Sequence, residues 1–312
     1  MSRRFRLEAL DIFYNIVAFI STEEPPMHER NTDPSMDADE EYDGRPASET
    51  EAHFLDLAMR AAGVIDPASA VEGVAAPVPI CAPVGTLDAL VVRVIRETES
   101  VSSFEFRPLG AEARAFRPRP GQFVPLRVSI DGAVHERCYA VSSLVARGDV
   151  PRLTIKRVPS GLVSNWCHDR LKAGMRVSIG PVAGRFRLRP GRSPLVFMAA
   201  GIGIAPLFPM FKEALLHGRR AITMMVFDRD AESAVFLKTM RTLARKHAAR
   251  LQLVEIYAGD AGAISQDAIR QKLAGLANAD VYMCGPAGFM QCAETAAQCV
   301  GVSPDRIFIN AR

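Results

Sequence analysis

Two short segments carry side chains that can bind phosphate and cover a planar ring. Residues 137–143 read Arg-Cys-Tyr-Ala-Val-Ser-Ser, and residues 161–165 read Gly-Leu-Val-Ser-Asn. The guanidinium of Arg137 can donate two parallel hydrogen bonds to a phosphate, and Tyr139 can cover one face of a ring. A helix that begins near Gly161 would present unpaired N–H groups and the positive end of its dipole. The two segments therefore predict a pyrophosphate site beside an aromatic side chain.

Two further segments contain glycine and follow apolar runs typical of buried strands. Residues 199–206 read Ala-Ala-Gly-Ile-Gly-Ile-Ala-Pro, and residues 284–290 read Cys-Gly-Pro-Ala-Gly-Phe-Met. Gly201 and Gly203 would let the backbone approach the pyrophosphate of a dinucleotide, and Pro206 suits the first turn of a helix. A lone Gly-x-Gly is a weak signal, and the second segment strengthens it.

The elements that must position these segments change character along the chain. Between residues 87 and 181, short alternating runs separated by Gly and Pro predict a closed antiparallel barrel. The expected strands cover residues 87–95, 104–108, 124–129, 137–141, 152–158 and 177–181. One helix, at residues 163–171, interrupts them.

After Pro194 strands alternate with helices, which predicts a parallel sheet with helices on both faces. The expected strands cover residues 195–200, 222–227, 251–257, 281–284 and 306–309, and the helices residues 205–217, 231–247, 265–273 and 287–299. Ligands bind at the carboxyl ends of such strands. We therefore expect three parts: an N-terminal extension (1–83), a six-stranded antiparallel β-barrel (84–190) and a doubly wound α/β domain (191–312).

The four segments, in this order and spacing, resemble the ferredoxin–NADP reductase family over about residues 85–310. The resemblance implies an FAD-binding barrel and an NAD(P)-binding domain that pass electrons from a nicotinamide through the flavin to an acceptor. FAD is favoured over FMN, which some relatives with similar barrels use. The stretch from Gly161 to His168 resembles bacterial reductases that serve oxygenases and desaturases.

The resemblance also assigns residues to the two cofactors. The flavin residues are Arg137, Cys138, Tyr139, Ala140, Ser143, Lys156, Val158, Gly161, Leu162, Val163 and Ser164. The nicotinamide residues are Gly201, Gly203, Ala205, Pro206, Asp228, Arg229, Cys284, Gly285, Pro286, Phe289 and Met290. Tyr139, Ala140 and Cys284 would flank the path of the hydride, and Ser164 or Asn165 is expected to cap the helix.

Two of these positions carry a particular expectation. Ala140 stands where the family has Ser or Thr, and the lost hydroxyl contact, worth about 1–3 kcal/mol, would slow hydride transfer. Asp228 can accept from a ribose 2′-OH and repel a 2′-phosphate, which favours NADH over NADPH, while Arg229 keeps NADPH open. The plainer readings are that Asp228 only starts a helix at Ala231 and that Cys284 is a buried small hydrophobe.

Charge and cysteine content bear on partners and compartment. Residues 1–80 carry 16 acidic and 6 basic side chains, whereas the rest of the chain carries 19 acidic and 32 basic ones. A basic body predicts an acidic partner, here a ferredoxin or an oxygenase component rather than nucleic acid. Six scattered cysteines without a Cys-x-x-Cys pair indicate a reduced, cytoplasmic protein without an iron–sulfur cluster or another metal site.

The N-terminal extension shows no membrane span, because no run of about 18 apolar residues occurs. Residues 1–20 imitate a signal peptide, but interrupting polar residues favour a docking or interfacial helix. Residues 22–47 are expected to be a disordered linker, and residues 48–63 a helix.

Three functions fit the sequence. The first is a flavin-dependent NAD(P)H reductase that feeds a separate iron–sulfur protein or oxygenase, since neither an iron–sulfur domain nor a terminal aromatic follows residue 310. The second is a stand-alone diaphorase or flavin reductase. The third is a non-catalytic redox-sensing or docking subunit, which Ala140 favours slightly.

Overall fold

The computed structural model of the chain describes residues 86–145, 150–258 and 265–310. These residues belong to one compact unit. The helices and the linker expected before residue 84 lie outside the described residues.

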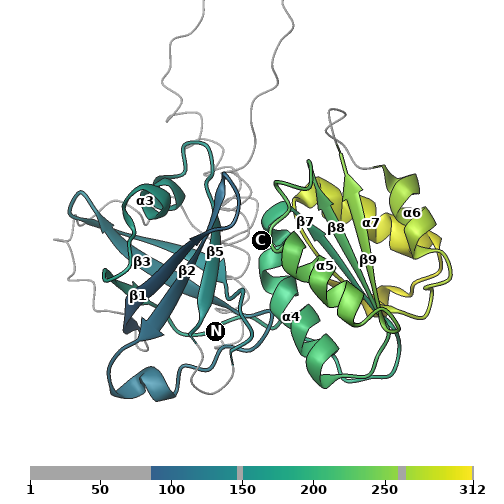
Figure 1. Cartoon of the computed structure of the whole chain (residues 1–312), viewed down its shortest axis with the longest axis horizontal. Helices are drawn as coiled ribbons and strands as arrows, with labels where there is room; N and C mark the ends of the chain where they lie inside the picture. Colours follow the sequence, from purple (N-terminus) through teal and green to yellow (C-terminus); the bar gives the residue numbers. More distant parts are fainter. Residues whose placement is uncertain (1–85, 146–149, 259–264, 311–312) are drawn as a thin grey trace, which may run out of the picture. The chain divides into compact units, whose positions relative to one another are not determined.

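The first half of the described chain forms the predicted antiparallel sheet of six strands (Figure 1). Its strands are β1 (Leu87–Arg96), β2 (Val101–Pro108), β3 (Phe123–Ile130), β4 (Ala133–Ala140), β5 (Arg152–Lys156) and β6 (Arg176–Ile179). They are ordered β4-β3-β6-β1-β2-β5, and a bridge between Val141 and Leu153 joins the two ends into a barrel. Alternate residues of the strands, such as Val124 and Leu126 of β3, point into a buried apolar core.

Two short elements complete the barrel. A 3-10 turn, η2 (Ala111–Arg114), precedes β3, and helix α3 (Leu162–Arg170) connects β5 to β6. The buried residues Val163 and Cys167 of α3 belong to the barrel core. The helix lies over one end of the barrel (Figure 1).

The second half forms a parallel sheet of five strands in the order β11-β10-β7-β8-β9. Its elements are β7 (Leu195–Ala200), η3 (Gly201–Gly203), α4 (Ile204–His217), β8 (Ile222–Asp228), α5 (Leu237–Lys246), β9 (Leu251–Tyr257), α6 (Gln266–Leu273), β10 (Asp280–Cys284), α7 (Ala287–Cys299), η5 (Pro304–Arg306) and β11 (Ile307–Ile309). The chain leaves β7 toward β8 and later returns to the other side of β7 as β10. The strand order therefore reverses between β7 and β10, where ligands bind in such sheets.

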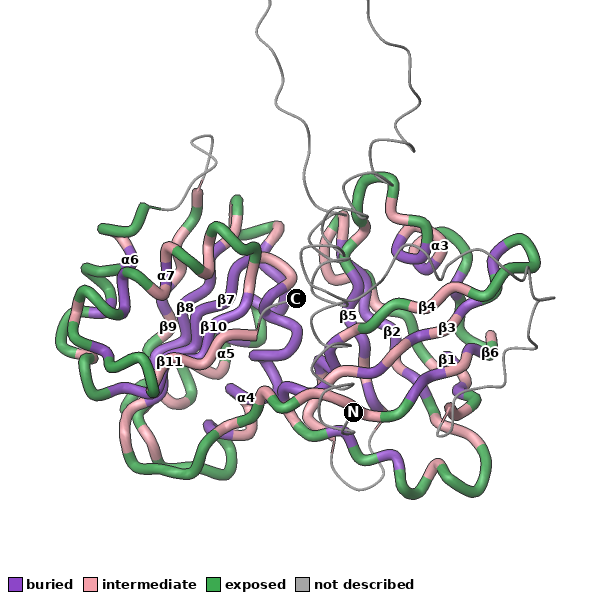
Figure 2. The backbone as a smooth tube through the Cα atoms, turned by 180° about the vertical axis from the view of Figure 1, so that it is seen from behind, coloured by how far each residue is buried: buried purple, intermediate pink, exposed green. Residues whose placement is uncertain are grey.

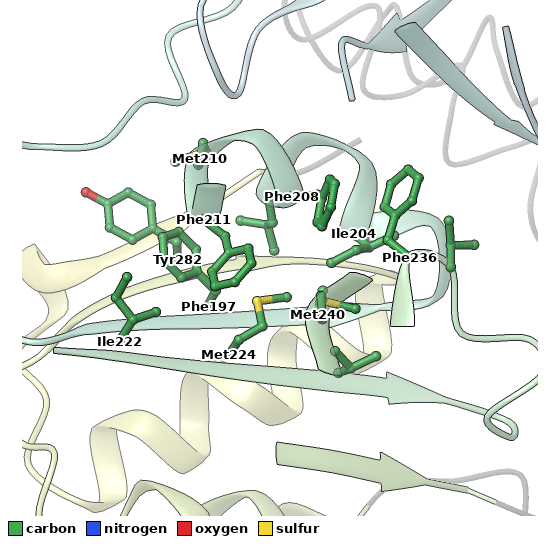
Figure 3. Close-up of a cluster of buried hydrophobic side chains, with 14 of the residues drawn as sticks. Phe197, Ile204, Phe208, Met210, Phe211, Ile222, Met224, Phe236, Met240 and Tyr282 are labelled. Atoms are coloured by element: carbon green, nitrogen blue, oxygen red, sulfur yellow. The ribbon is translucent and has the colours of Figure 1, made fainter. Parts of the chain in front are cut away.

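Helices cover both faces of this sheet. Helices α4 and α5 share one apolar cluster with alternate residues of β7 and β8, and α6 and α7 share a second cluster with the intervening residues. Strands β7 and β10 are buried along their whole lengths (Figure 2), as expected for parallel strands covered on both faces. Figure 3 shows the α4 side, where Phe197, Phe211 and Tyr282 pack together. The Tyr282 hydroxyl accepts a hydrogen bond of 2.8 Å from the Arg189 N–H, so this buried polar group is paired.

For one helix, the predicted first residue is wrong. The helix expected at residues 231–247 begins only at Leu237, after Phe236 in the left-handed region (φ 63°). The Asp230 carboxylate accepts the Ser233 N–H at 2.7 Å, and this local turn replaces the first helical turns. No helix among the described residues has the length and apolar character needed to cross a bilayer.

Candidate active site

Arg137 and Tyr139 lie two residues apart on β4 and therefore share one face of the strand. The two-residue turn Asp131–Gly132, with φ angles of 50° and 82°, is the hairpin turn that Asp-Gly favours, and it sets the register that places Tyr139 opposite Val124. Tyr139 packs against the barrel core from one side. Arg137 is exposed, and its guanidinium donates to the Glu136 carbonyl at 2.8 Å.

The start of α3 is built by a tight loop between Val158 and Gly161. Gly161 is the N-cap, and a side chain at Gly161 would overlap the Ser164 hydroxyl. The prediction that Ser164 or Asn165 caps the helix is wrong. Ser164 is the third helical residue; its hydroxyl accepts from the Val158 N–H (3.3 Å) and donates to the Gly161 carbonyl (3.2 Å). Because the Ser164 hydroxyl closes the loop, no side chain caps the helix, and the first N–H groups have no acceptor within the helix.

The two elements that carry the predicted flavin residues, β4 and α3, are in contact. An exposed arginine and a helix N-terminus are each suited to an anion such as a pyrophosphate. Val158 and Leu162 flank the helix start and are 40% and 48% exposed, so their apolar surfaces are accessible to a ligand. The combination fits a ligand with a charged centre and planar apolar groups, as FAD has.

The other predicted flavin residues are placed less directly. Cys138 lies on the opposite face of β4 from Arg137, and Ala140 is buried opposite Phe123. Ser143 accepts a hydrogen bond of 3.0 Å from the Arg152 N–H. The remaining two residues are Lys156, exposed at the end of β5, and Val163, which is buried in the barrel core and can offer only its backbone.

The two glycine turns of the parallel sheet meet where the strand order reverses. Gly201 has a φ of +52°, which favours glycine. A side chain at Gly203 would overlap the Cys284 carbonyl, and one at Gly285 would lie 2.8 Å from the Cβ of Ala200. The backbones after β7 and β10 therefore touch, and only glycine allows this approach.

The side chains predicted around these turns differ in access. Ala205 and Pro206 are buried in the first turn of α4, and the side chain of Cys284 is fully buried. Phe289 packs against Phe227, with ring centroids 4.8 Å apart. The two residues with more access are Pro286, which is exposed, and Met290, which is half-buried.

Asp228 ends β8 at the same edge of the sheet. Its carboxylate accepts the Arg229 N–H at 2.9 Å, and burial raises its pKa although Lys156 lies near enough to lower it. The Arg229 guanidinium binds Asp230 (3.0 Å) and Ser233 (3.0 Å). Arg229 is thus held by its own loop.

Sequence reasoning missed two polar groups near the site. Three buried hydroxyls form a chain in which Thr154 lies 2.6 Å from Ser142 and 2.8 Å from Ser103. His168 on α3 bonds both β2 and β5. A signal for His168 existed, since it lies one helical turn after Ser164, whereas nothing in the sequence pairs Ser103 with Thr154. Among the described residues, no three His, Cys, Asp or Glu side chains converge as a metal site would require.

Comparison with known families gives two matches in the order of the two sheets. The family model described as "Oxidoreductase FAD-binding domain" matches residues 88–188, and that described as "Oxidoreductase NAD-binding domain" matches residues 197–295.

Among curated relatives, the 3-ketosteroid-9-alpha-monooxygenase ferredoxin reductase component of Mycolicibacterium smegmatis is 36% identical over 231 residues, which cover 72% of this chain and 64% of the relative. The same component from Rhodococcus rhodochrous is 32% identical, over 69% of this chain and 61% of the relative. The chain thus spans less than two thirds of the length of these relatives.

Solved structures share the fold. The Amycolatopsis cytochrome P450 reductase GcoB has a TM-score of 0.60 and 25% identity, with 72% of this chain and 68% of that chain covered. Phthalate dioxygenase reductase has a TM-score of 0.59 and 18% identity, with the same coverage of both chains.

Proposed function

Because the chain belongs to the ferredoxin–NADP reductase family, we propose that it is an FAD-dependent NAD(P)H reductase that passes electrons to a separate oxygenase component or ferredoxin. The observation that supports this proposal is the contact between β4, which carries Arg137 and Tyr139, and α3, whose first turn would bind the pyrophosphate. The cysteines of the described residues are scattered and form no disulfide, which supports a reducing, cytoplasmic compartment.

Each residue of the barrel site has a distinct role in holding FAD. Arg137 and the first turn of α3 would neutralise the pyrophosphate, and Gly161 keeps that turn open to it. Tyr139 would cover one face of the flavin ring, while Val158 and Leu162 shield its apolar parts from water. A bound FAD would supply the redox chemistry that links two-electron donation by NAD(P)H to one-electron delivery to the acceptor.

The touching glycine turns would hold the coenzyme. Gly201 leaves the backbone accessible at the end of β7, while Gly203 and Gly285 let the backbones after β7 and β10 pack closely. The N–H groups at the start of α4 can bind the coenzyme pyrophosphate, because Ala205 and Pro206 keep their side chains inside. Cys284 acts through the position of its backbone, since its thiol is buried.

The geometry supports NADH as the preferred coenzyme. Asp228 ends the strand at which an acidic residue accepts from the ribose 2′-OH. Arg229 could otherwise attract a 2′-phosphate, but its guanidinium is engaged by Asp230 and Ser233. A 2′-phosphate would therefore meet a carboxylate without a released cation to compensate it.

Reduction and acceptor assays test the proposal in two steps. The FAD-loaded chain is mixed anaerobically with NADH or NADPH, and loss of flavin absorbance is followed by stopped flow; we expect faster reduction by NADH. The reduced protein is then offered an acidic ferredoxin, an oxygenase component and free quinone. Faster electron transfer to the protein acceptors supports the proposal, and preference for the quinone supports a stand-alone diaphorase. If neither NADH nor NADPH reduces the bound flavin, the proposed reductase activity is refuted.

A further inference from the structure

His168 is a polar side chain of α3 that the cofactor contacts do not use. It follows Ser164 by four residues, so both side chains lie on the helix face that packs on the barrel. Its ring meets the edge of Phe104, with centroids 6.4 Å apart and planes at 81°.

Both ring nitrogens of His168 have partners on the barrel. Nε2 lies 2.9 Å from the Ile155 carbonyl, and Nδ1 lies 3.4 Å from the Ser102 hydroxyl. Ser102 of β2 and Ile155 of β5 are direct cross-strand partners. One imidazole therefore fastens α3 to two neighbouring strands at a single point.

The partners select one tautomer of the neutral ring. A carbonyl oxygen only accepts, so Nε2 carries the proton and donates to Ile155; Nδ1 of the neutral ring then accepts from the Ser102 hydroxyl. Protonation would make Nδ1 a donor and force that hydroxyl to reverse. It would also place a positive charge in a half-buried site.

We propose that His168 is a positioning residue: its neutral imidazole fixes the position of α3 on the barrel, so that the first turn of the helix can bind the flavin pyrophosphate. The inference rests on the proposed FAD site. The helix begins six residues before His168, about 9 Å along its axis, so a shift of α3 at this point displaces its N-terminus as a rigid piece.

The surrounding charges make the contact sensitive to pH. The pKa of His168 lies below its usual value, mainly because of burial, and the nearby Arg157 and Arg96 lower it further, while Asp169 and the bond to Ile155 oppose this. Since the folded pKa is depressed, the contact is complete above the ordinary histidine pKa and is lost as pH falls through the folded value. FAD affinity should fall over the same pH range. Since the pyrophosphate of FAD does not titrate in this range, the fall would report on the protein and not on the ligand.

The single tryptophan of the chain provides a reporter. Trp166 lies on α3 two residues before His168 and packs against the barrel core, so its fluorescence follows the seating of the helix. The test compares wild type with His168→Gln, which keeps one donor but cannot titrate, and with His168→Phe, which keeps the ring but loses both bonds. His217→Gln, at an exposed histidine of α4, is the matched control.

Two measurements are made between about pH 5 and pH 8: Trp166 fluorescence of the flavin-free chain, and the Kd for FAD. We expect wild type and His217→Gln to show a fluorescence transition and an FAD affinity that falls by up to about tenfold at the acid end, whereas His168→Gln shows neither. His168→Phe should bind FAD about tenfold more weakly at neutral pH. An unchanged pH profile in His168→Gln would overturn the inference even though FAD binds. Failure of wild type to bind FAD would instead refute the flavin site, while the fluorescence titration would still test the seating of α3.

Discussion

Replacing Arg137 by alanine should weaken FAD binding without disturbing the fold. Arg137 is exposed, so its removal opens no cavity. Within the described residues its guanidinium makes one hydrogen bond, to the Glu136 carbonyl, and the Glu136 carboxylate pairs with Arg127. A hydrogen bond to a charged group contributes about 1.5–3 kcal/mol, and solvent screening at an exposed site reduces the sum of two such bonds to about 2–3 kcal/mol. The Kd for FAD should therefore rise by about 30- to 150-fold.

The assay is a fluorescence titration of FAD into the flavin-free protein at two salt concentrations, with thermal unfolding as a check on folding. Arg137→Lys keeps the charge but loses the planar fork, so it should show an intermediate loss of about fivefold to tenfold. Arg176→Ala, at an exposed arginine of β6, serves as the control and should leave the Kd unchanged. If Arg137→Ala binds FAD within twofold of wild type at low salt, the assignment of Arg137 to the phosphate is refuted.

Three further changes test other parts of the structure. Gly203→Ala should lower the free energy of unfolding by about 2 kcal/mol or more and abolish NADH binding, because the new Cβ overlaps the Cys284 carbonyl. The control is Gly288→Ala on α7, where an added Cβ meets no atom within 4 Å and the stability should equal that of wild type. Asp280→Asn removes a buried charge that pairs with Arg220 and with Arg306 (2.9 Å). Urea unfolding should show that the free energy of unfolding falls by about 3–5 kcal/mol. A decrease as small as that caused by Asp267→Asn, at an exposed ion pair, would contradict this prediction. Burial raises the pKa of Asp228, so NADH affinity should decline as pH falls through that raised value, and Asp228→Asn should lose this dependence; the same pH profile of the NADH Kd in wild type and Asp228→Asn would speak against its role.

Most of the fold could be predicted from sequence because local patterns and packing agree. The wholly apolar run Leu195–Ala200 and the alternation in Phe123–Ile130 each fit one kind of sheet. The start of α5 could not be predicted, because residues 231–236 suit a helix locally. There the bond from the Ser233 N–H to Asp230 fixes a turn instead.

The candidate site divides in a similar way. Arg137, Tyr139 and the glycines could be found from sequence because residue type and spacing are informative there. A glycine indicates a close backbone approach or a positive φ, and an arginine indicates a bound anion. The role of Ser164 was misjudged, because a serine near a helix start fits both a cap and a loop closure, and only the position of Val158 decides between them. His168 was not assigned, since its partners Ser102 and Ile155 lie 66 and 13 residues away.

The most direct test of the whole account is the uptake of FAD by the purified chain. FAD is added to flavin-free protein, unbound flavin is removed, and the bound flavin is counted from its visible absorbance before and after anaerobic addition of NADH. We predict one tightly held FAD per chain, which NADH bleaches. A protein that stays colourless after this treatment would contradict the proposed site at β4 and α3.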